Sequence, residues 1–154
     1  FPSRKRHFEN YVEICSGTDL SRRVFRACAH LIREAADLAQ SVGSGLVVVT
    51  VPELSPLAQG QLEQALAQPG AGEGYDASRP DRRIEEICRE VGIPFIALAD
   101  ELGPEDYLEK DVHWNASGHL KVHDALRRIW TERPPAPHPS GRPEEVAAPA
   151  RTAS

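Results

Sequence analysis

The sequence contains no methionine and only three cysteines among its 154 residues. Because a methionine is missing, Phe1 cannot be a translation start, and we expect the chain to belong to a longer product. Cys15, Cys28 and Cys88 are odd in number and far apart, so they give neither a Cys-x-x-Cys motif nor a disulfide framework. We expect them to be small buried hydrophobic side chains.

Long apolar runs and an excess of basic residues are also missing. The longest apolar run, residues 46–51 with one threonine inside it, is far too short to cross a bilayer. No signal peptide is visible, because the basic residues 4–6 are not followed by an apolar stretch. The 18 basic and 23 acidic side chains give a net charge of -5, which argues against a general nucleic-acid binder. With 40% hydrophobic and 27% charged residues, the composition is typical of a globular domain with a sizeable core.

The composition changes near residue 132. The segment 133–154 contains six prolines, together with Ala, Glu, Arg and Ser, and almost no large apolar side chain. Such a segment cannot bury enough apolar surface to offset the entropy lost on ordering. We therefore predict one domain over residues 1–132 and a disordered Pro/Ala-rich tail over residues 133–154.

Hydrophobic patterning predicts strands over residues 11–15, 46–51 and 93–98, and helices over residues 19–40, 55–67, 80–91 and 116–130. The run 46–51 is continuous and β-branched, which is typical of a strand buried on both faces. Asp19 or Ser21 is expected to cap the first helix and Asn115 the last one. The glycine-rich segment 69–74 is expected to be a surface loop. The order β-α-β-α-α-β-α favours an α/β fold with a parallel sheet covered by helices on both faces.

In such sheets the active site lies beyond the carboxyl ends of the strands. The segments that follow the predicted strands are residues 16–19, 52–54 and 99–115. The most informative part lies at 110–119, where Asp111 stands two residues before His113 in a loop that leads into the last helix. An aspartate can orient a histidine, which then acts as general base and later as general acid.

The block 111–119, Asp-Val-His-Trp-Asn-Ala-Ser-Gly-His, resembles the last conserved block of the SGNH/GDSL hydrolases. The resemblance implies a flavodoxin-like three-layer α/β/α fold with a parallel sheet. It also implies a serine nucleophile acting on esters, often acetyl groups on carbohydrates or lipids, and no metal or other cofactor. It makes His113 the general base and acid and Asp111 its orienting partner, with Trp114 and Asn115 supporting the loop.

A second block, residues 12–20, resembles the strand-plus-loop block of the same family that is written Gly-x-Asn-Asp. The asparagine of that block donates a hydrogen bond to the oxyanion. In this sequence Thr18 stands in its place beside Gly17. The resemblance therefore implies that Gly17 and Thr18 border the oxyanion region.

The Gly-Asp-Ser block that carries the family's nucleophile has no counterpart in this sequence. We expect the serine and the first strand to lie upstream of Phe1, the sheet to be incomplete at its N-terminal side, and this chain alone to be inactive. Ser16 and Ser117 are the alternative nucleophiles near the predicted site. The expected substrate is a small-molecule or carbohydrate ester. Two other functions stay open, a polysaccharide O-acyltransferase and a non-catalytic binding or structural module.

The histidines allow a competing interpretation as a metal site. His113, His119 and His123 could be ligands, since His119 and His123 stand four residues apart on one helix face as zinc ligands can, and Asp111 could be a fourth ligand. No Cys or Glu ligand pattern completes this set, so we favour packing and surface roles for His119 and His123.

Overall fold

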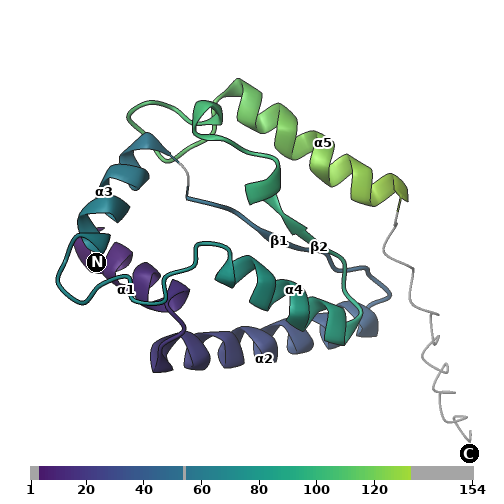
Figure 1. Cartoon of the computed structure of the whole chain (residues 1–154). Coiled ribbons are helices and arrows are strands. Elements are labelled where there is room, and N and C mark those ends of the chain that lie inside the picture. The colour runs from purple at the N-terminus through teal and green to yellow at the C-terminus, as the bar shows by residue number, and fades with distance from the viewer. Residues whose placement is uncertain (1–3, 54, 133–154) are drawn as a thin grey trace, which may run out of the picture.

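The computed structural model describes residues 4–53 and 55–132, so the predicted tail over residues 133–154 lies outside the described residues. Within them the chain forms five α-helices, two β-strands and two short 3-10 turns (Figure 1). In chain order these are α1 (Arg4–Cys15), α2 (Asp19–Ser41), β1 (Val48–Thr50), α3 (Pro56–Leu66), α4 (Arg79–Val91), β2 (Phe95–Ala97), η1 (Leu98–Asp100), η2 (Pro104–Asp106) and α5 (Ala116–Glu132). No helix in this part of the chain is long and apolar enough to span a bilayer.

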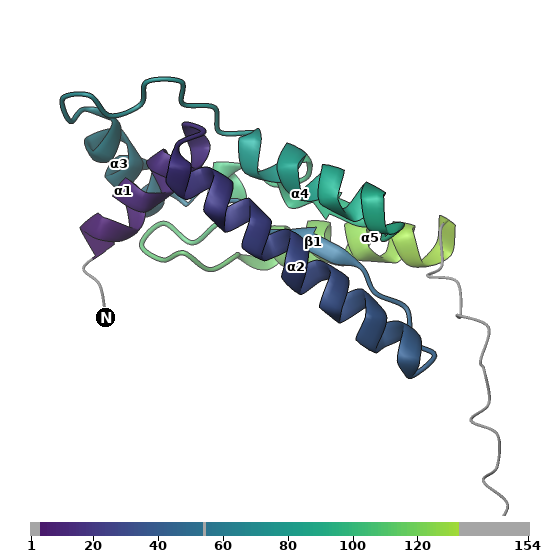
Figure 2. The same ribbon diagram turned by 90° about the horizontal axis from the view of Figure 1, so that it is seen from below.

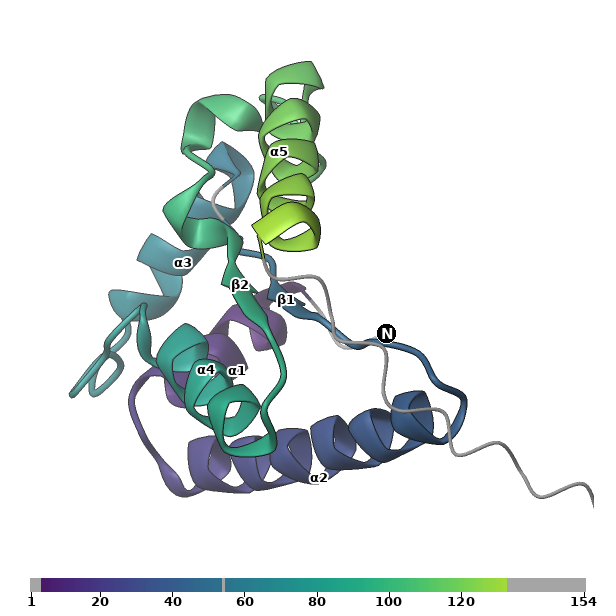
Figure 3. The ribbon, with the colours of Figure 1, turned by 90° about the vertical axis from the view of Figure 1, so that its right-hand side faces the viewer.

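The two strands form a parallel sheet with helices on either side. β1 pairs with β2 in parallel, with Val49 opposite Ile96 at the centre of the register. Figure 3 shows α5 on one side of the sheet and α4 and α2 on the other. The α/β arrangement and the strands within residues 46–51 and 93–98 are thereby confirmed. Burial of the first of these strands on both faces is wrong: β1 is half-buried, because β2 is its single partner among the described strands.

The strand predicted over residues 11–15 is wrong, because this segment is the end of α1. Its β-branched and aromatic side chains favour a strand locally, but burial follows the helical period. Phe8, Val12 and Cys15 are spaced by four and three residues, and all three are buried. Phe8 and Val12 pack with Ala58 of α3 in one apolar cluster. Tertiary packing of a helix face therefore outweighs local strand propensity.

The helix predicted over residues 19–40 is confirmed as α2, but its expected caps are wrong. Thr18 has extended backbone angles, and its hydroxyl accepts a hydrogen bond from the Ser21 N–H at 3.3 Å. The Ser21 side chain is turned away from the helix end, since its hydroxyl donates to the Ile14 carbonyl at 2.8 Å. At the other end, Gly43 has a φ of 68°, a left-handed conformation that suits glycine after a helix.

The other predicted helices are confirmed with small shifts at their ends. The Ser55 hydroxyl caps α3 by accepting from the Ala58 N–H at 3.2 Å. In α4, Pro80 is the second helical residue, and Gly92 ends the helix with a φ of 79°. The segment 69–74 forms turns, as expected of a surface loop.

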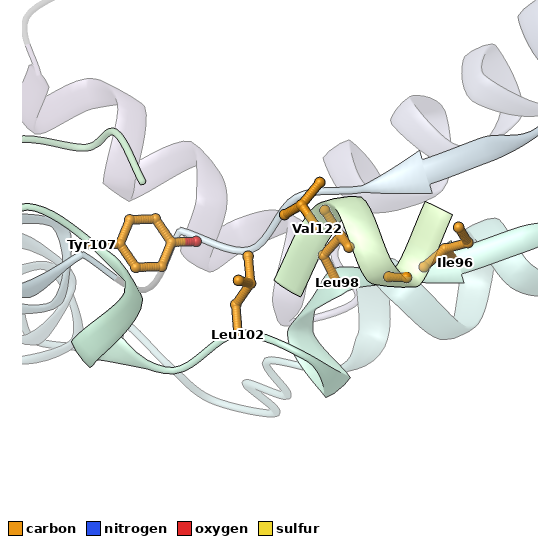
Figure 4. Close-up of a cluster of buried hydrophobic side chains, with 6 residues drawn as sticks. Ile96, Leu98, Leu102, Tyr107 and Val122 are labelled. Carbon is orange, nitrogen blue, oxygen red and sulfur yellow. The ribbon is translucent and has the colours of Figure 1, made fainter. Parts of the chain in front are cut away.

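The main core lies between the sheet and α5. Figure 4 shows a cluster of buried side chains from β2, η1, the segment after it and α5. Its buried members are Ile96, Leu98, Leu102, Tyr107, Val122 and Ala125. Val49 of β1 and Trp114 of the segment before α5 pack against this cluster. The segment that carries the Asp-x-His motif is therefore attached to the main core.

Two of the three cysteines are buried, as the sequence predicts. Cys15 and Cys88 have no exposed surface, whereas Cys28 on α2 is only half-buried. Burial raises the pKa of the Cys15 and Cys88 thiols, which keeps them in the protonated, unreactive form.

Truncation of Leu98 tests the position of this core. Leu98 is 1% exposed, so Leu98→Ala should lower the free energy of unfolding by about 2–5 kcal/mol in urea denaturation. The control Leu120→Ala removes the same atoms from a side chain that is 62% exposed, and it should change stability by less than about 0.5 kcal/mol. Equal losses in the two variants would contradict the packing described here.

Candidate active-site loop

Residues 107–114 form a closed loop between η2 and α5, called here the 107–114 loop. Tyr107 and Trp114 form an antiparallel bridge at its base. The Leu108 N–H donates to the His113 carbonyl at 3.0 Å, and the Asn115 N–H donates to the Asp106 carbonyl at 2.9 Å. These backbone hydrogen bonds fix the two ends of the loop next to each other.

Asn115 caps α5 and joins it to the loop, as predicted. Its Oδ1 accepts from the Gly118 N–H at 3.1 Å, which is a helix N-cap. Its Nδ2 donates to the carbonyls of Glu105 at 2.7 Å and Tyr107 at 3.3 Å. One side chain thus connects the start of α5 with both η2 and the first residue of the loop.

Asp106, which is not among the predicted site residues, is the buried anchor of the loop. Its side chain is completely buried and accepts from the Gly103 N–H at 2.8 Å, the Ser117 hydroxyl at 2.9 Å and the Lys121 ammonium at 2.6 Å. The Gly103 N–H and the charged Lys121 lower the pKa of the Asp106 carboxyl. The signal in the sequence is Pro104 followed two residues later by an acid, which is typical of a helical turn whose acid reaches back to its first N–H.

Gly118 allows α5 to start directly against η2. A Cβ atom at this position would lie 2.4 Å from the Asp106 carbonyl oxygen and 3.0 Å from the Trp114 Cβ. Both contacts are too short, and the first is with backbone that cannot move aside freely. The motif therefore has glycine at this position because any larger side chain would clash.

Asp111 and His113 lie together in the outer part of the loop. His113 Nδ1 and Asp111 Oδ1 are 2.7 Å apart, and the same oxygen accepts from the Val112 N–H at 2.7 Å. Because the carboxylate can only accept, Nδ1 carries a proton, and in the neutral form of the ring Nε2 then has the lone pair. The hydrogen bonds from His113 and the Val112 N–H lower the pKa of the Asp111 carboxyl.

The exposure of this pair determines what it can do. The His113 side chain is 74% exposed, and its Nε2 has no hydrogen-bond partner among the described residues. A histidine held at Nδ1 by a carboxylate and open at Nε2 can remove a proton from an incoming hydroxyl. The two residues thus have the arrangement expected of an orienting acid and a general base.

Trp114 and His119 support the loop rather than extend the site. Their rings meet edge to face, with centroids 5.5 Å apart. Trp114 also packs against the main core, which agrees with its expected supporting role. His123 Nδ1 lies 3.1 Å from the Asp124 carboxylate. In the described part of the chain, no three or more His, Cys, Asp or Glu side chains are grouped so as to hold a metal ion.

The loop is attached to the carboxyl end of the sheet. The Tyr107 hydroxyl donates to the Pro52 carbonyl at 2.6 Å, and Pro52 lies two residues after β1. An open groove of about 860 Å³ lies at the same edge, between α3, α4 and the ends of β1 and β2. Its lining residues do not include Asp111 or His113. The base of the loop therefore lies at the carboxyl edge of the sheet, and the pair lies outside this groove.

Gly17 and Thr18 lie in a different part of the molecule. They form the turn between α1 and α2, where Gly17 has a φ of 74° and faces the Arg79 guanidinium, and Thr18 caps α2. Figures 1 and 3 show this turn and the 107–114 loop at opposite ends of the ribbon. Because a helix, not a strand, precedes the turn, the structure does not bring Gly17 and Thr18 to His113.

The two alternative serines are both engaged elsewhere. The Ser16 hydroxyl donates to the Val12 carbonyl at 2.8 Å within the turn after α1. The Ser117 hydroxyl donates to Asp106. Neither hydroxyl contacts His113, so neither is in place as its nucleophile.

Comparison of the chain with protein-family models, with curated proteins and with solved structures gives no match. The function is therefore inferred from the residues themselves. Three features bear on the function: the oriented pair Asp111–His113, the anchors Asp106 and Asn115, and the attachment of the base of the loop to the carboxyl edge of a parallel sheet.

A methyl group at Gly118 should loosen the loop. Because Cβ would overlap the Asp106 carbonyl, Gly118→Ala should cost about 1–3 kcal/mol of unfolding free energy. Hydrogen exchange at the Leu108 amide should become faster. Gly60→Ala is the matched control, since Gly60 lies in α3 with no atom within 4 Å of the place that the added methyl group would take, and it should be neutral or stabilising. An unchanged Leu108 amide in Gly118→Ala would contradict the role given to this glycine.

Asp106 should make stability depend on pH in the acid range. Its folded pKa is lowered, so the stability from its ionised form is present above the unfolded value of about 3.9 and is lost as pH falls through the folded pKa. The difference in unfolding free energy between the wild type and Asp106→Asn should be constant near neutral pH and shrink below pH ~4. A difference that stays constant down to the folded pKa would show that Asp106 is not ionised in the fold.

Proposed function

We propose that the chain carries the histidine and aspartate of an SGNH/GDSL-like serine ester hydrolase with a flavodoxin-like α/β/α fold. The observation that supports this most directly is the 2.7 Å contact between His113 Nδ1 and Asp111 Oδ1 in the loop before the last helix. Residues near the pair support the loop: Asn115 caps α5, and Gly118 allows the close contact between α5 and the Asp106 carbonyl. The resemblance and the local geometry thus point to the same chemistry.

In this proposal His113 Nε2 removes the proton from a serine hydroxyl as the oxygen attacks the ester carbonyl. Asp111 keeps Nε2 as the free nitrogen and stabilises the imidazolium that forms. The imidazolium then donates its proton to the departing alkoxide, which leaves an acyl-enzyme. Water attacks the acyl group in a second, equivalent cycle. None of these steps needs a metal or a nucleotide.

The nucleophile in this proposal is a serine outside the described residues. The exposed Nε2 of His113 leaves room for a hydroxyl from another segment. Leu108 and Val112, which belong to the same loop as the pair, are 44% and 46% exposed and offer apolar contacts for an acyl group or a sugar ring. A small-molecule or carbohydrate ester fits this surface.

Substitution of the pair in the full-length protein tests the proposal on p-nitrophenyl acetate. His113→Ala and Asp111→Asn should each lower kcat by about a thousandfold or more with the fold intact by circular dichroism. His123→Ala is the matched control, since His123 also lies next to an aspartate on the surface, and it should stay within about twofold of the wild type. Full activity in His113→Ala would contradict the assignment.

Labelling with a fluorophosphonate identifies the nucleophile. The full-length protein should be labelled on one serine, and the labelling should slow by about a hundredfold or more in His113→Ala. A protein that hydrolyses no ester and takes up no label would favour the non-catalytic module instead.

A further inference from the structure

The open groove between α3, α4 and the ends of the two strands has no part in the chemistry assigned to His113. Its volume of about 860 Å³ lies in the range of small-molecule sites, which is roughly 300–1,000 Å³. The carboxyl ends of parallel strands are also where ligands bind in α/β sheets. Figure 2 shows the segment 67–78, which adds further lining residues, running from the end of α3 to the start of α4 along one margin of the ribbon. The groove is therefore a candidate ligand site of its own.

Part of the groove lining is apolar and suits the body of an organic ligand. Leu62 of α3 and Phe95 and Ala97 of β2 line the groove and are half-buried. Tyr11 of α1 and Tyr75 of the segment before α4 add two half-buried aromatic side chains. Burial raises the pKa of both phenols, so they stay uncharged at neutral pH. The face of an uncharged aromatic ring attracts an organic cation.

The charged side chains of the groove are almost all acidic. Five carboxylates and one guanidinium line it, whereas the whole chain has 23 acidic and 18 basic side chains. The carboxylates belong to the segment after β1, to α3, to α4 and to η1, and they are Glu53, Glu63, Asp81, Glu85 and Asp100. A cleft lined by charges of one sign focuses the electric field and draws in ligands of the opposite sign. The groove therefore favours a cation.

Three of the five carboxylates have no counter-ion among the described residues. These are Glu63, Asp81 and Asp100, whereas the other two pair with a histidine and an arginine outside the groove. The single guanidinium of the lining, that of Arg82, is held by Asp76 and by the Ser78 hydroxyl. The negative charge of the groove is therefore not balanced by the chain around it.

The carboxylates are too dispersed to be the ligands of one metal ion. Within residues 4–53 and 55–132, no three His, Cys, Asp or Glu side chains are grouped so as to hold a metal. A calcium or magnesium ion needs its oxygen ligands at about 2.0–2.6 Å. An organic cation has a larger body and is attracted by carboxylates that stand apart around a rim. The lining thus fits an ammonium group on an apolar body better than a metal ion.

We propose that the groove binds a small organic ammonium compound, with its charge near Glu63 and Asp81 and its apolar body against Phe95 and the two tyrosines. The carboxylates and the aromatic faces attract the charge, and the apolar body is removed from water. One carboxylate comes from α3 and the other from α4, so the ligand would contact both helices. This binding goes beyond the proposed hydrolase, because the groove lining does not include Asp111 or His113.

Calorimetric titration of the full-length protein tests whether the ligand must be charged. The probes are choline, spermidine and the uncharged isostere of choline in which a tert-butyl group replaces the trimethylammonium group. At least one of the two cations should bind about tenfold or more tightly than the isostere. Choline alone would assign the groove to quaternary ammonium ligands, and spermidine alone to amines. If neither cation binds better than the isostere, the proposal is overturned.

Amide substitutions test the place of binding. Glu63→Gln/Asp81→Asn should weaken binding of the better cation about tenfold, because the amides keep the side-chain shape and remove two charges. Neither side chain is buried, so the variant should fold normally. Glu34→Gln/Asp37→Asn is the matched control, since it removes two exposed carboxylates of α2 that do not line the groove, and it should bind like the wild type.

Two results of this comparison would contradict the proposed site. Equal losses of affinity in the two double variants would show a general effect of net charge, and unchanged affinity in Glu63→Gln/Asp81→Asn would place the cation elsewhere. Titration measures binding alone, so neither result depends on ester hydrolysis.

Discussion

The buried carboxylate of Asp106 is the interaction on which the candidate site depends most. It joins the N–H of Gly103 at the start of η2 to Ser117 and Lys121 on α5. A buried charge is stable only when its oxygens are fully satisfied, and here one backbone and two side-chain donors do so. Because η2 and α5 flank the 107–114 loop, this group and the backbone hydrogen bonds at the base of the loop together hold the loop's two ends close to each other.

The site has a clear internal order from anchor to reactive group. Asp106 and Asn115 fix the base, Gly118 permits the close contact of α5 with η2, and Trp114 joins the loop to the core. The outer pair, Asp111 and His113, is open to solvent. The motif residues therefore divide into those that build the loop and those available for chemistry.

The sequence predicts well where the determinants are local. The apolar runs 46–51 and 93–98, the α2 pattern and the Asn115 cap depend on neighbouring residues, and the structure agrees with them. The prediction fails where distant contacts decide. Residues 11–15 have strand propensity, but their helix is stabilised by packing on α3. Pro104 and Asp106 indicate a capped turn, but the contact of Asp106 with Lys121 depends on how α5 folds back and cannot be predicted from neighbouring residues. Gly17 and Thr18 lie away from the site because the helix α1, and not a strand, precedes them.

The hydrogen bond from the Tyr107 hydroxyl to the Pro52 carbonyl has a consequence for motion. It couples the loop to the residue that follows the sheet, so the loop cannot swing as an independent lid without breaking this bond or unpacking Tyr107 from the core. The conformational entropy of the loop is then lost once, during folding, and not at each encounter with a ligand. In the proposed hydrolase, a substrate would therefore meet an imidazole whose orientation is already set, and it would be selected by its fit to a rigid loop and not by closure of a lid.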